Sequence, residues 1–453
     1  MVEQADVVVI GMGPGGEELA GRLAEEGLDV VGIDGRLVGG ECPYWGCIPS
    51  KMMLRAAGLL AEARRVPGMA GRAAVTPDWA PVAKRIREEA TDNWDDHVAV
   101  ERFESKGGHF VRGWARLTGP GRVSVGERDF EAGRAVVINS GTHPWTPPVP
   151  GLADVSYWTN REAIEATEVP SSLVVLGGGA IGAELGQAFA RFGAAVTVVE
   201  AAPHLLPPEE PESGQLLLQA LTGEGLRVLT GAEVKRVRGD DAAIALELGT
   251  GESVEGEHLL VATGRRADLA ALGIGSVGLD EKARSISVDG TCRAAPGLWA
   301  IGDVTGVGAF THVSMYQARI AEADILGRAT AQADYRALPR VTFTDPEIGS
   351  VGLSEAGARA AGLHVRTGMA DLASSARGWI HKVGNSGFVK LVEDADRGVL
   401  VGATSAGPCG GEVLSMLTLA VHASVPTAEL GTMIYAYPTF HRAVESAVRD
   451  LES

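Results

Sequence analysis

Residues 6–16 read DVVVIGMGPGG, a short apolar strand that runs into a glycine-rich turn. A helical stretch follows, and the next strand, residues 30–33, ends in Asp34. In this G-x-G-x-x-G pattern the first glycine permits a tight turn, the second lets backbone N–H groups approach a pyrophosphate, and the third allows the helix to pack closely on the strand. The helix N-terminus attracts phosphate charge, and the terminal carboxylate accepts hydrogen bonds from a ribose. The stretch therefore predicts a dinucleotide-binding βαβ unit.

The same design recurs in residues 172–182, which read SLVVLGGGAIG. The helix after them leads to a strand at residues 195–199 that ends in Glu200, and in both copies the acid follows the first glycine by 23 residues. One such match can arise from another glycine-rich turn, but two in register favour two bound dinucleotides. The sequence predicts an α/β protein with two Rossmann-like dinucleotide-binding domains.

Strand-like runs at residues 135–141 and 259–264 each end in a turn of small residues, as if closing a nucleotide-binding unit. A proline-rich stretch, PPVPG at residues 147–151, is typical of a domain crossing. From about residue 338 the chain changes character, because a strand-like run at 387–392 precedes a helical pattern at 411–423. These features predict a third domain of the α+β class.

Composition excludes several kinds of partner. The net charge of −18 repels phosphate backbones, so nucleic acid is not expected as a partner. The first apolar run, residues 7–10, is too short to cross a membrane or to form the core of a signal peptide, so no membrane partner is expected. Only four cysteines occur in 453 residues, which is too few for a structural disulfide framework. We expect a reducing cytoplasm, where a disulfide is usually catalytic.

Residues 39–51 read GGECPYWGCIPSK and carry half of the chain's four cysteines. Cys42 and Cys47 are separated by four residues and follow directly after the first βαβ pattern. The pair could be two buried structural cysteines. Two thiols at this spacing beside a bound redox cofactor instead indicate that electrons pass through a disulfide.

With these motifs in view, the whole chain resembles the FAD-dependent pyridine nucleotide–disulfide oxidoreductases, which include dihydrolipoamide dehydrogenase, mercuric reductase and soluble transhydrogenase. Further landmarks are IGD at residues 301–303 and FTDPEIGSVG at residues 343–352. The resemblance implies an enzyme with FAD and NAD as cofactors, acting as a homodimer on a small-molecule acceptor. It also implies four segments: an FAD-binding domain at 1–150, an NAD(H)-binding domain at 151–267, a central segment at 268–337 that completes the FAD domain, and an interface domain at 338–453.

The resemblance assigns cofactor contacts residue by residue. For FAD it implies cradling of the pyrophosphate, adenosine, ribityl chain and flavin by Gly11, Gly13, Gly16, Asp34, Gly40, Lys51, Ala115, Gly302, Asp303 and Thr311. For the nicotinamide cofactor it implies Gly177, Gly179, Gly182, Glu200 and Gly264. Asp34 is shorter than the glutamate usual in the family, so it needs a closer approach or a bridging water.

Glu200 favours NADH over NADPH. A carboxylate holds free ribose hydroxyls but repels a 2′-phosphate, and a site for NADPH usually supplies an arginine nearby. The next ten residues, 201–210, contain no arginine or lysine.

The resemblance makes Cys42 the thiol that faces the substrate and Cys47 the thiol that faces the flavin. A helix that begins near them favours the thiolate form through its dipole. Lys51 is expected to pair with Glu184 beside flavin N5, where hydride arrives. Cys292 and Cys409 lack a partner spacing, and we expect both to be inert.

Residues 435–442, YAYPTFHR, depart from the family pattern. Its disulfide reductases have histidine before Pro-Thr and a glutamate five residues later, on a segment that reaches the partner subunit's site. Here Tyr437 and Arg442 occupy those places, and His441 stands where the family places no base. Histidine titrates near 6.5 and tyrosine near 10, so only about one phenol in a thousand is ionised at pH 7. Efficient lipoamide or glutathione turnover is therefore not expected.

Two functions remain open at this point. In the first, a dihydrolipoamide dehydrogenase-like enzyme passes electrons from NADH through the flavin to the Cys42–Cys47 disulfide and on to an unidentified acceptor. In the second, a flavin electron-transfer enzyme (a transhydrogenase, or an NADH:quinone or metal-ion reductase) leaves the cysteines secondary. A flavin-binding redox sensor is a third reading, and nothing in the composition favours it. The acceptor, the direction of the reaction, and the roles of Tyr437, His441 and Arg442 are not fixed by the sequence.

Overall fold

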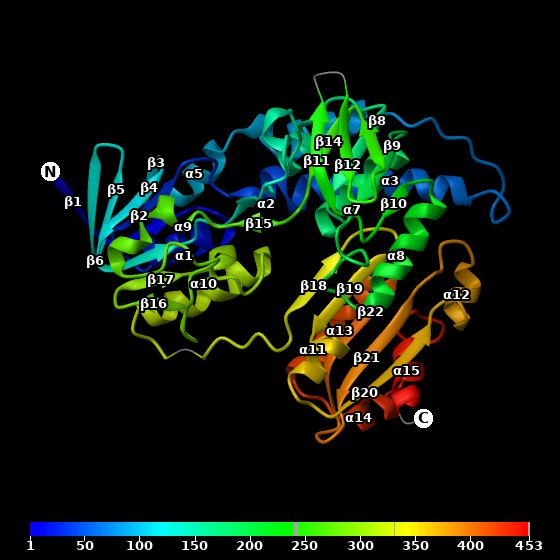
Figure 1. The fold of residues 1–453 in the computed structure, drawn as a ribbon. Helices are drawn as coiled ribbons and strands as arrows, with labels where there is room; N and C mark the ends of the chain where they lie inside the picture. Colours follow the sequence, from blue (N-terminus) through cyan, green and yellow to red (C-terminus); the bar gives the residue numbers. More distant parts are fainter. Residues whose placement is uncertain (240–242, 330, 452–453) are drawn as a thin grey trace. The chain divides into compact units, whose positions relative to one another are not determined.

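The computed structural model describes residues 1–239, 243–329 and 331–451. Its contacts divide the chain into two compact units (Figure 1). The first unit comprises Met1–Pro49, Lys84–Trp145 and Gly264–Asp334, and the second comprises Ser50–Ala83, Thr146–Thr263 and Tyr335–Ser453. The domain limits expected from the sequence stay predictions.

The first unit is built on a mixed sheet in the order β16-β17-β6-β1-β2-β3, and β5 continues it from β6 to β4. β1 pairs in parallel with β2 and β6, and β17 pairs in parallel with β6. The strands are β1 (Val2–Ile10), β2 (Val30–Asp34), β3 (His109–Arg112), β4 (Ala115–Gly119), β5 (Arg122–Val125), β6 (Arg128–Ile138), β16 (Arg293–Ala295) and β17 (Leu298–Ala300). The helices named below are α1 (Pro14–Glu25), α2 (Glu41–Trp45), α5 (His97–Glu104) and α10 (Thr311–Ile325).

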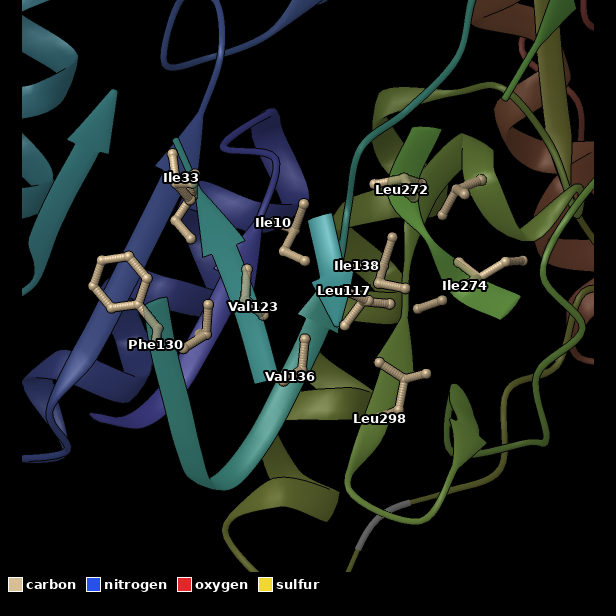
Figure 2. Packing of buried hydrophobic residues seen from close by; sticks show 14 of the residues in the cluster. Ile10, Ile33, Leu117, Val123, Phe130, Val136, Ile138, Leu272, Ile274 and Leu298 are labelled. Carbon is tan, nitrogen blue, oxygen red and sulfur yellow. The ribbon is translucent and has the colours of Figure 1, made fainter. Parts of the chain in front are cut away.

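Alternation along β1 explains how the sheet is covered on both faces. Val8 and Ile10 belong to one apolar cluster, whereas Val7 and Val9 belong to another. Successive side chains of a strand point to opposite faces, so a strand buried on both sides is apolar throughout. Figure 2 shows the first cluster, in which Ile10 of β1 lies between Ile33 of β2 and Ile138 of β6. The carboxyl ends of the parallel strands are thereby fixed at one edge.

The second unit contains a parallel sheet in the order β10-β9-β8-β14 and a small antiparallel sheet β11-β12-β13. The strands are β8 (Ser172–Leu176), β9 (Ala195–Val199), β10 (Arg227–Leu229), β14 (His258–Val261), β11 (Val234–Gly239), β12 (Ile244–Leu248) and β13 (Ser253–Gly256). The helices that matter here are α3 (Cys47–Arg65), whose first three residues count with the first unit, α7 (Ala180–Arg191) and α8 (Pro211–Gly223).

A five-stranded antiparallel sheet completes the second unit in the order β18-β19-β22-β21-β20. Its strands are β18 (Pro339–Thr342), β19 (Glu347–Gly352), β20 (Val365–Asp371), β21 (Phe388–Asp394) and β22 (Val399–Gly407). The helices α13 (Gly410–His422) and α15 (Ala443–Leu451) supply residues such as Leu417 and Val448 to the same apolar cluster as the sheet. This part has the α+β character that the sequence indicates from residue 338 onward.

Most element limits differ from the expected ones by a few residues. The largest difference is at β6, which begins at Arg128, whereas the sequence indicates a strand-like run from residue 135. Its partner β1 also begins early, at Val2 instead of Asp6. Residues 2–5 pair in parallel with residues 129–132 of β6, and a register shift separates them from Val7. Residues 2–4 are exposed, and Glu3 and Gln4 are polar. The sequence therefore shows no apolar strand pattern at the start of β1.

Candidate functional site

The first glycine-rich turn joins β1 to α1 and has no room for side chains at two positions. Gly11 has φ of +93°, and a Cβ there would lie 2.3 Å from the carbonyl oxygen of Asn139. A Cβ on Gly16 would lie 2.1 Å from the carbonyl oxygen of Gly11. Gly13 is the N-cap of α1, and no side chain caps that helix end. The first N–H groups of α1 are therefore left for an external acceptor, which fits the pyrophosphate of FAD.

Asp34 ends β2 beside this turn. Its Oδ2 accepts a hydrogen bond from the Met12 amide at 2.8 Å, and its Oδ1 accepts one from the Arg36 amide at 2.7 Å. Burial raises the pKa of Asp34, and the two amide hydrogen bonds oppose that effect. Each carboxylate oxygen can accept a further hydrogen bond, so the site suits a ribose hydroxyl.

Asp303 follows β17 and accepts a hydrogen bond from the Thr142 hydroxyl at 2.9 Å. Burial raises the pKa of Asp303. Gly302 has φ of +78°, and a Cβ there would lie 2.8 Å from the side-chain oxygens of both Asn139 and Ser314. Gly302 therefore permits the chain to pass close to the start of α10.

Several polar residues that hold this part together were missed by sequence reasoning. The Asn139 amide donates to the Gly11 carbonyl at 3.2 Å and accepts from the Ser314 hydroxyl at 3.0 Å, tying the turn to α10. Arg265 donates to the Thr142 carbonyl at 2.7 Å. The available signal was position alone, since Asn139 directly follows a parallel strand, where ligand-binding residues gather.

Ala115 begins β4, and its backbone pairs with Val125 in the sheet. The residue before it, Trp114, is 71% exposed although its indole covers Gly35, whose Cβ would lie 2.4 Å from the ring. The Arg36 guanidinium lies 5.5 Å from the indole centroid. Ala115 and the chain after Asp34 therefore lie in one neighbourhood, as an adenosine site requires.

Cys42 lies in α2 and Cys47 is the first residue of α3. The loop before them touches the first glycine-rich turn, because a Cβ on Gly40 would lie 2.9 Å from the Cα of Gly13. The Cys47 sulfur lies 3.4 Å from the Thr311 hydroxyl at the start of α10. Cys42 is half-buried, whereas Cys47 is exposed.

The two thiols do not hold charge equally. Hydrogen bonding to Cys47 and burial raise the pKa of the Cys42 thiol well above its usual range, and negative charge on Cys47 adds to the effect. For Cys42 this differs from the sequence expectation that a helix N-terminus favours the thiolate. The reason is that the hydrogen bond to the neighbouring sulfur and burial both favour the protonated form of Cys42. Of the other cysteines, Cys292 is buried and Cys409 is exposed.

The second glycine-rich turn, between β8 and α7, repeats the contacts of the first. Gly177 has φ of +112°, and a Cβ on Gly182 would lie 2.0 Å from the Gly177 carbonyl oxygen. Gly179 is the N-cap of α7 without a side-chain cap, and a Cβ there would meet nothing within 4 Å. The Glu200 carboxylate accepts from the amides of Gly178 and Ala202, both at 2.7 Å. Gly264, expected at the same cofactor, has φ of +121° and counts with the first unit.

Lys51 of α3 and Glu184 of α7 form an ion pair, with 2.8 Å between Nζ and Oε2. Glu184 is buried, and its other oxygen accepts from the Phe343 amide at 2.8 Å. The Lys51 ammonium also lies 4.7 Å from the centroid of the Phe343 ring. Both oxygens of the buried carboxylate are thus occupied, and the lysine is held in one place.

Tyr437 is 70% exposed and lies between α14 (Thr427–Thr432) and α15. The Arg442 guanidinium lies 5.6 Å from its ring centroid and pairs with Glu445 at 2.9 Å. His441 lies 3.4 Å from the Thr439 hydroxyl within the same turn. Tyr437 and Arg442 are therefore neighbours, whereas His441 makes its contact with its own segment.

Two kinds of feature are absent from the described residues. In the part of the chain that the structure describes, no group of three or more histidine, cysteine or acidic residues could hold a metal ion. Across residues 1–239, 243–329 and 331–451, no helix combines the length and the apolar character needed to cross a membrane.

Comparison with known proteins agrees with this arrangement. Residues 5–318 match the family described as pyridine nucleotide-disulphide oxidoreductase, and residues 338–448 match its dimerisation domain. The chain is 34% identical to dihydrolipoyl dehydrogenase 3 of Pseudomonas aeruginosa, over 100% of this chain and 98% of that protein. It is 30% identical to a mercuric reductase of Staphylococcus aureus, over 98% of this chain and 81% of that protein. The crystal structure of LpdA from Mycobacterium tuberculosis matches with a TM-score of 0.86 at 27% identity, over 99% of this chain and 100% of the other.

Proposed function

The chain belongs to the pyridine nucleotide-disulphide oxidoreductases, and from that membership we propose how its own residues divide the work. The enzyme is an oxidoreductase that uses FAD and NAD(H) and whose electrons reach a disulfide. The residue roles and the nature of the acceptor form the proposal. The contact of Cys47 with Thr311, on the unit that carries the first glycine-rich turn, is the observation that supports it most.

FAD is assigned to the first unit. Gly11, Gly13 and Gly16 leave the N–H groups of α1 open for its pyrophosphate, and Asp34 is poised for its ribose. When bound, FAD supplies a hydride acceptor and an electron relay to the disulfide. Thr311 begins α10 and contacts the sulfur of Cys47, which begins α3. This contact supports the assignment of Thr311 and the thiol pair to the flavin end.

The nicotinamide cofactor is assigned to the second glycine-rich turn. Glu200 is fixed by two amide hydrogen bonds at the end of β9, which leaves its remaining lone pairs for two ribose hydroxyls. A 2′-phosphate would meet this carboxylate directly, so the enzyme is expected to prefer NADH. Lys51 and Glu184 are assigned to the flavin end of the hydride path, with the lysine supplying positive charge.

The thiols of Cys42 and Cys47 are assigned the next step. Two electrons and one proton open their S–S bond, leaving a thiol on Cys42 and a thiolate on Cys47. The raised pKa of Cys42 supports that placement of the proton. The same proton makes Cys42 a weak nucleophile near neutral pH, because the thiolate is the reactive form.

The acceptor is therefore proposed to need little proton transfer from the protein. Tyr437 stands where a histidine base would serve a disulfide substrate, and a phenol is the weaker base at neutral pH. Dihydrolipoamide-type turnover is then slow. The same two observations favour one alternative, in which a quinone, a metal ion or a second nicotinamide takes electrons without the thiols.

A serine at position 42 separates the two functions. Steady-state NADH oxidation is measured with disulfides, quinones and metal ions as acceptors. We expect Cys42→Ser to abolish turnover with the acceptor that the wild-type enzyme reduces fastest. Cys409→Ser is the matched control, because Cys409 is an exposed thiol outside the Cys42–Cys47 loop. Unchanged turnover in Cys42→Ser with every acceptor would sink the disulfide mechanism and leave the alternative.

The matched dimerisation domain supports a homodimer. We propose that Tyr437 serves the site of the partner subunit, since its side chain is exposed and stands on the segment that carries the base in disulfide-reducing relatives. We also propose a cytoplasmic setting, because only four cysteines occur in 453 residues and a catalytic disulfide suits a reducing compartment.

A further inference from the structure

The ion pair of Lys51 and Glu184 belongs to a longer chain of contacts along one face of α7. Glu184, Gln187 and Arg191 are spaced three and four residues apart, so they lie on the same side of the helix. All three are buried. Each of them contacts residues 343–345, the segment that joins β18 to β19.

The contacts follow the backbone of that segment step by step. Glu184 accepts from the Phe343 amide at 2.8 Å. The amide of Gln187 accepts from the Asp345 N–H at 2.8 Å and donates to the Asp345 carbonyl at 2.9 Å. One side chain thus pairs with both polar backbone groups of one residue, which fixes position as well as distance.

The Asp345 carboxylate closes the arrangement. Its Oδ2 accepts from Arg191 and from Arg65, both at 2.7 Å. Arg191 is held in turn by the Glu224 carboxylate, with 2.8 Å from its Nε. Arg65 lies near the end of α3, the helix that carries Lys51, so α3 is joined to the same segment at two places about 21 Å apart along its axis.

We propose that Gln187 and Arg191 are positioning residues, which hold residues 343–345 so that Glu184 keeps Lys51 in one place. Without them the Phe343 amide is free to leave Glu184, and the carboxylate that orients the ammonium loses its second partner. The inference rests on the proposed function only where it places Lys51 beside the flavin. It ties the active-site lysine to the five-stranded interface sheet, since β18 ends just before this segment and β19 begins just after it.

The test uses purified holoenzyme and two readouts. The first is the rate at which an amine-reactive N-hydroxysuccinimide ester labels Lys51, followed by peptide mass spectrometry. The second is the midpoint potential of the bound flavin. The test variant is Gln187→Leu, which keeps the size of the side chain and removes all three of its hydrogen bonds: the two to Asp345 and one to the Glu224 carboxylate at 3.2 Å. Gln187→Glu restores the acceptor for the Asp345 N–H but not the donor.

We expect Gln187→Leu to raise Lys51 labelling at least threefold and to shift the flavin potential in the same direction as Glu184→Gln. The double variant Glu184→Gln/Gln187→Leu should shift the flavin potential no further than Glu184→Gln alone, because the effects of residues that act through one another are not additive. Gln187→Glu should give values between those of Gln187→Leu and the wild type in both readouts. Lys390→Met is the matched control: it breaks a different contact between α8 and the interface sheet, and should lower thermal stability without changing either readout.

The outcomes separate the inference from the proposed function. Lys51 labelling in Gln187→Leu that equals the wild type would overturn the positioning role. Shifts in labelling that add fully to those of Glu184→Gln would overturn it too. Raised labelling with an unchanged flavin potential in both Gln187→Leu and Glu184→Gln would uphold the positioning role and reject the placement of Lys51 beside the flavin.

Discussion

At the scale of single residues, Cys42 and Cys47 differ in exposure although they share neighbours. Cys42 is half-buried and hydrogen-bonded to Cys47, whereas Cys47 is exposed, and the Thr311 hydroxyl contacts both sulfurs. When two nearby thiols share one proton, negative charge on one sulfur raises the pKa of the other, as in other coupled acids. The raised pKa of Cys42 is the reason for our proposal that Cys42 keeps the proton of the reduced pair.

Removing the neighbour should release the proton of Cys42. We expect Cys47→Ala to lower the pKa of Cys42, because both the hydrogen bond and the negative charge disappear. Alkylation of Cys42 by iodoacetamide at pH 8 should then accelerate by about tenfold for each pKa unit regained. Peptide mass spectrometry gives the rate, and Cys409 in the same sample is the internal reference. An unaltered rate at Cys42 would show that burial alone protects it.

Tyr437 is the residue whose replacement should change the choice of acceptor. A positioned general base typically contributes about 10²–10⁴-fold, so Tyr437→His should raise NADH-linked lipoamide turnover by at least about tenfold. The gain should follow a pH profile with a midpoint near 6.5, the ordinary value for histidine. Tyr437→Phe serves as the control for size and should show no gain. Equal turnover in the histidine and phenylalanine variants would mean that the shape of the pocket, rather than the missing base, limits the reaction.

At the level of elements, the two βαβ turns are nearly the same device built twice. In each, the residue after the first glycine donates to the terminal acid, at 2.8 Å in the first turn and 2.7 Å in the second. Everything that makes this contact lies within about two dozen residues, so spacing in the sequence predicts it. The fold class and the glycines of both turns were therefore open to prediction.

Contacts between distant elements were not open to prediction in the same way. Gln187 and Asp345 are 158 residues apart, and neither belongs to a pattern that names the other. The pairing depends on α7 and the segment after β18 coming together, which only the tertiary fold decides. A buried glutamine on an apolar helix is equally consistent with many partners, so the sequence carries no signal for this one.

Tyr44 in α2 is a titrating group that makes the free energy of unfolding depend on pH in the alkaline range. Burial raises the pKa of Tyr44 to about 12, and the negative charge of Asp96 adds to it. Tyrosine in an unfolded chain titrates near 10, so the phenol contributes its full stability below about pH 10 and loses it as the pH rises toward 12. Over that window the free energy of unfolding should fall by up to about 3 kcal/mol more in the wild type than in Tyr44→Phe.

Denaturant unfolding at pH 9 and at pH 11.5 measures this difference. Tyr437→Phe is the control, since it removes an exposed phenol of the same chemistry. Parallel losses in the wild type and Tyr44→Phe would show that the tyrosine titrates alike in the folded and unfolded chains.

On the scale of the whole molecule, the acidic run at residues 209–212 joins the nucleotide-binding part of the second unit to its interface sheet. Glu209 accepts from Arg340 of β18 at 2.7 Å. The Lys390 ammonium of β21 lies 3.0 Å from Glu210, 2.7 Å from Glu212 and 3.1 Å from Glu355. A run of charges is usually a solvated surface, so the sequence indicates nothing of this contact. The nucleotide-binding part and the interface sheet should unfold together, because these ion pairs link them.

Lys390→Met tests that coupling. The Lys390 side chain is 6% exposed and its ammonium faces three carboxylates. Removing one partner of a buried ion pair typically costs about 3–5 kcal/mol. Arg359→Ala removes an exposed partner of the same Glu355 and should cost less than about 1 kcal/mol in the same denaturant titration. Acid should weaken the wild-type contact: hydrogen bonding to Lys390 holds the pKa of Glu355 below its ordinary 4.5, so its contribution is full above that pH and is lost as the pH falls further. If Lys390→Met and Arg359→Ala cost the same, the cluster is solvated and the two parts are free to unfold separately.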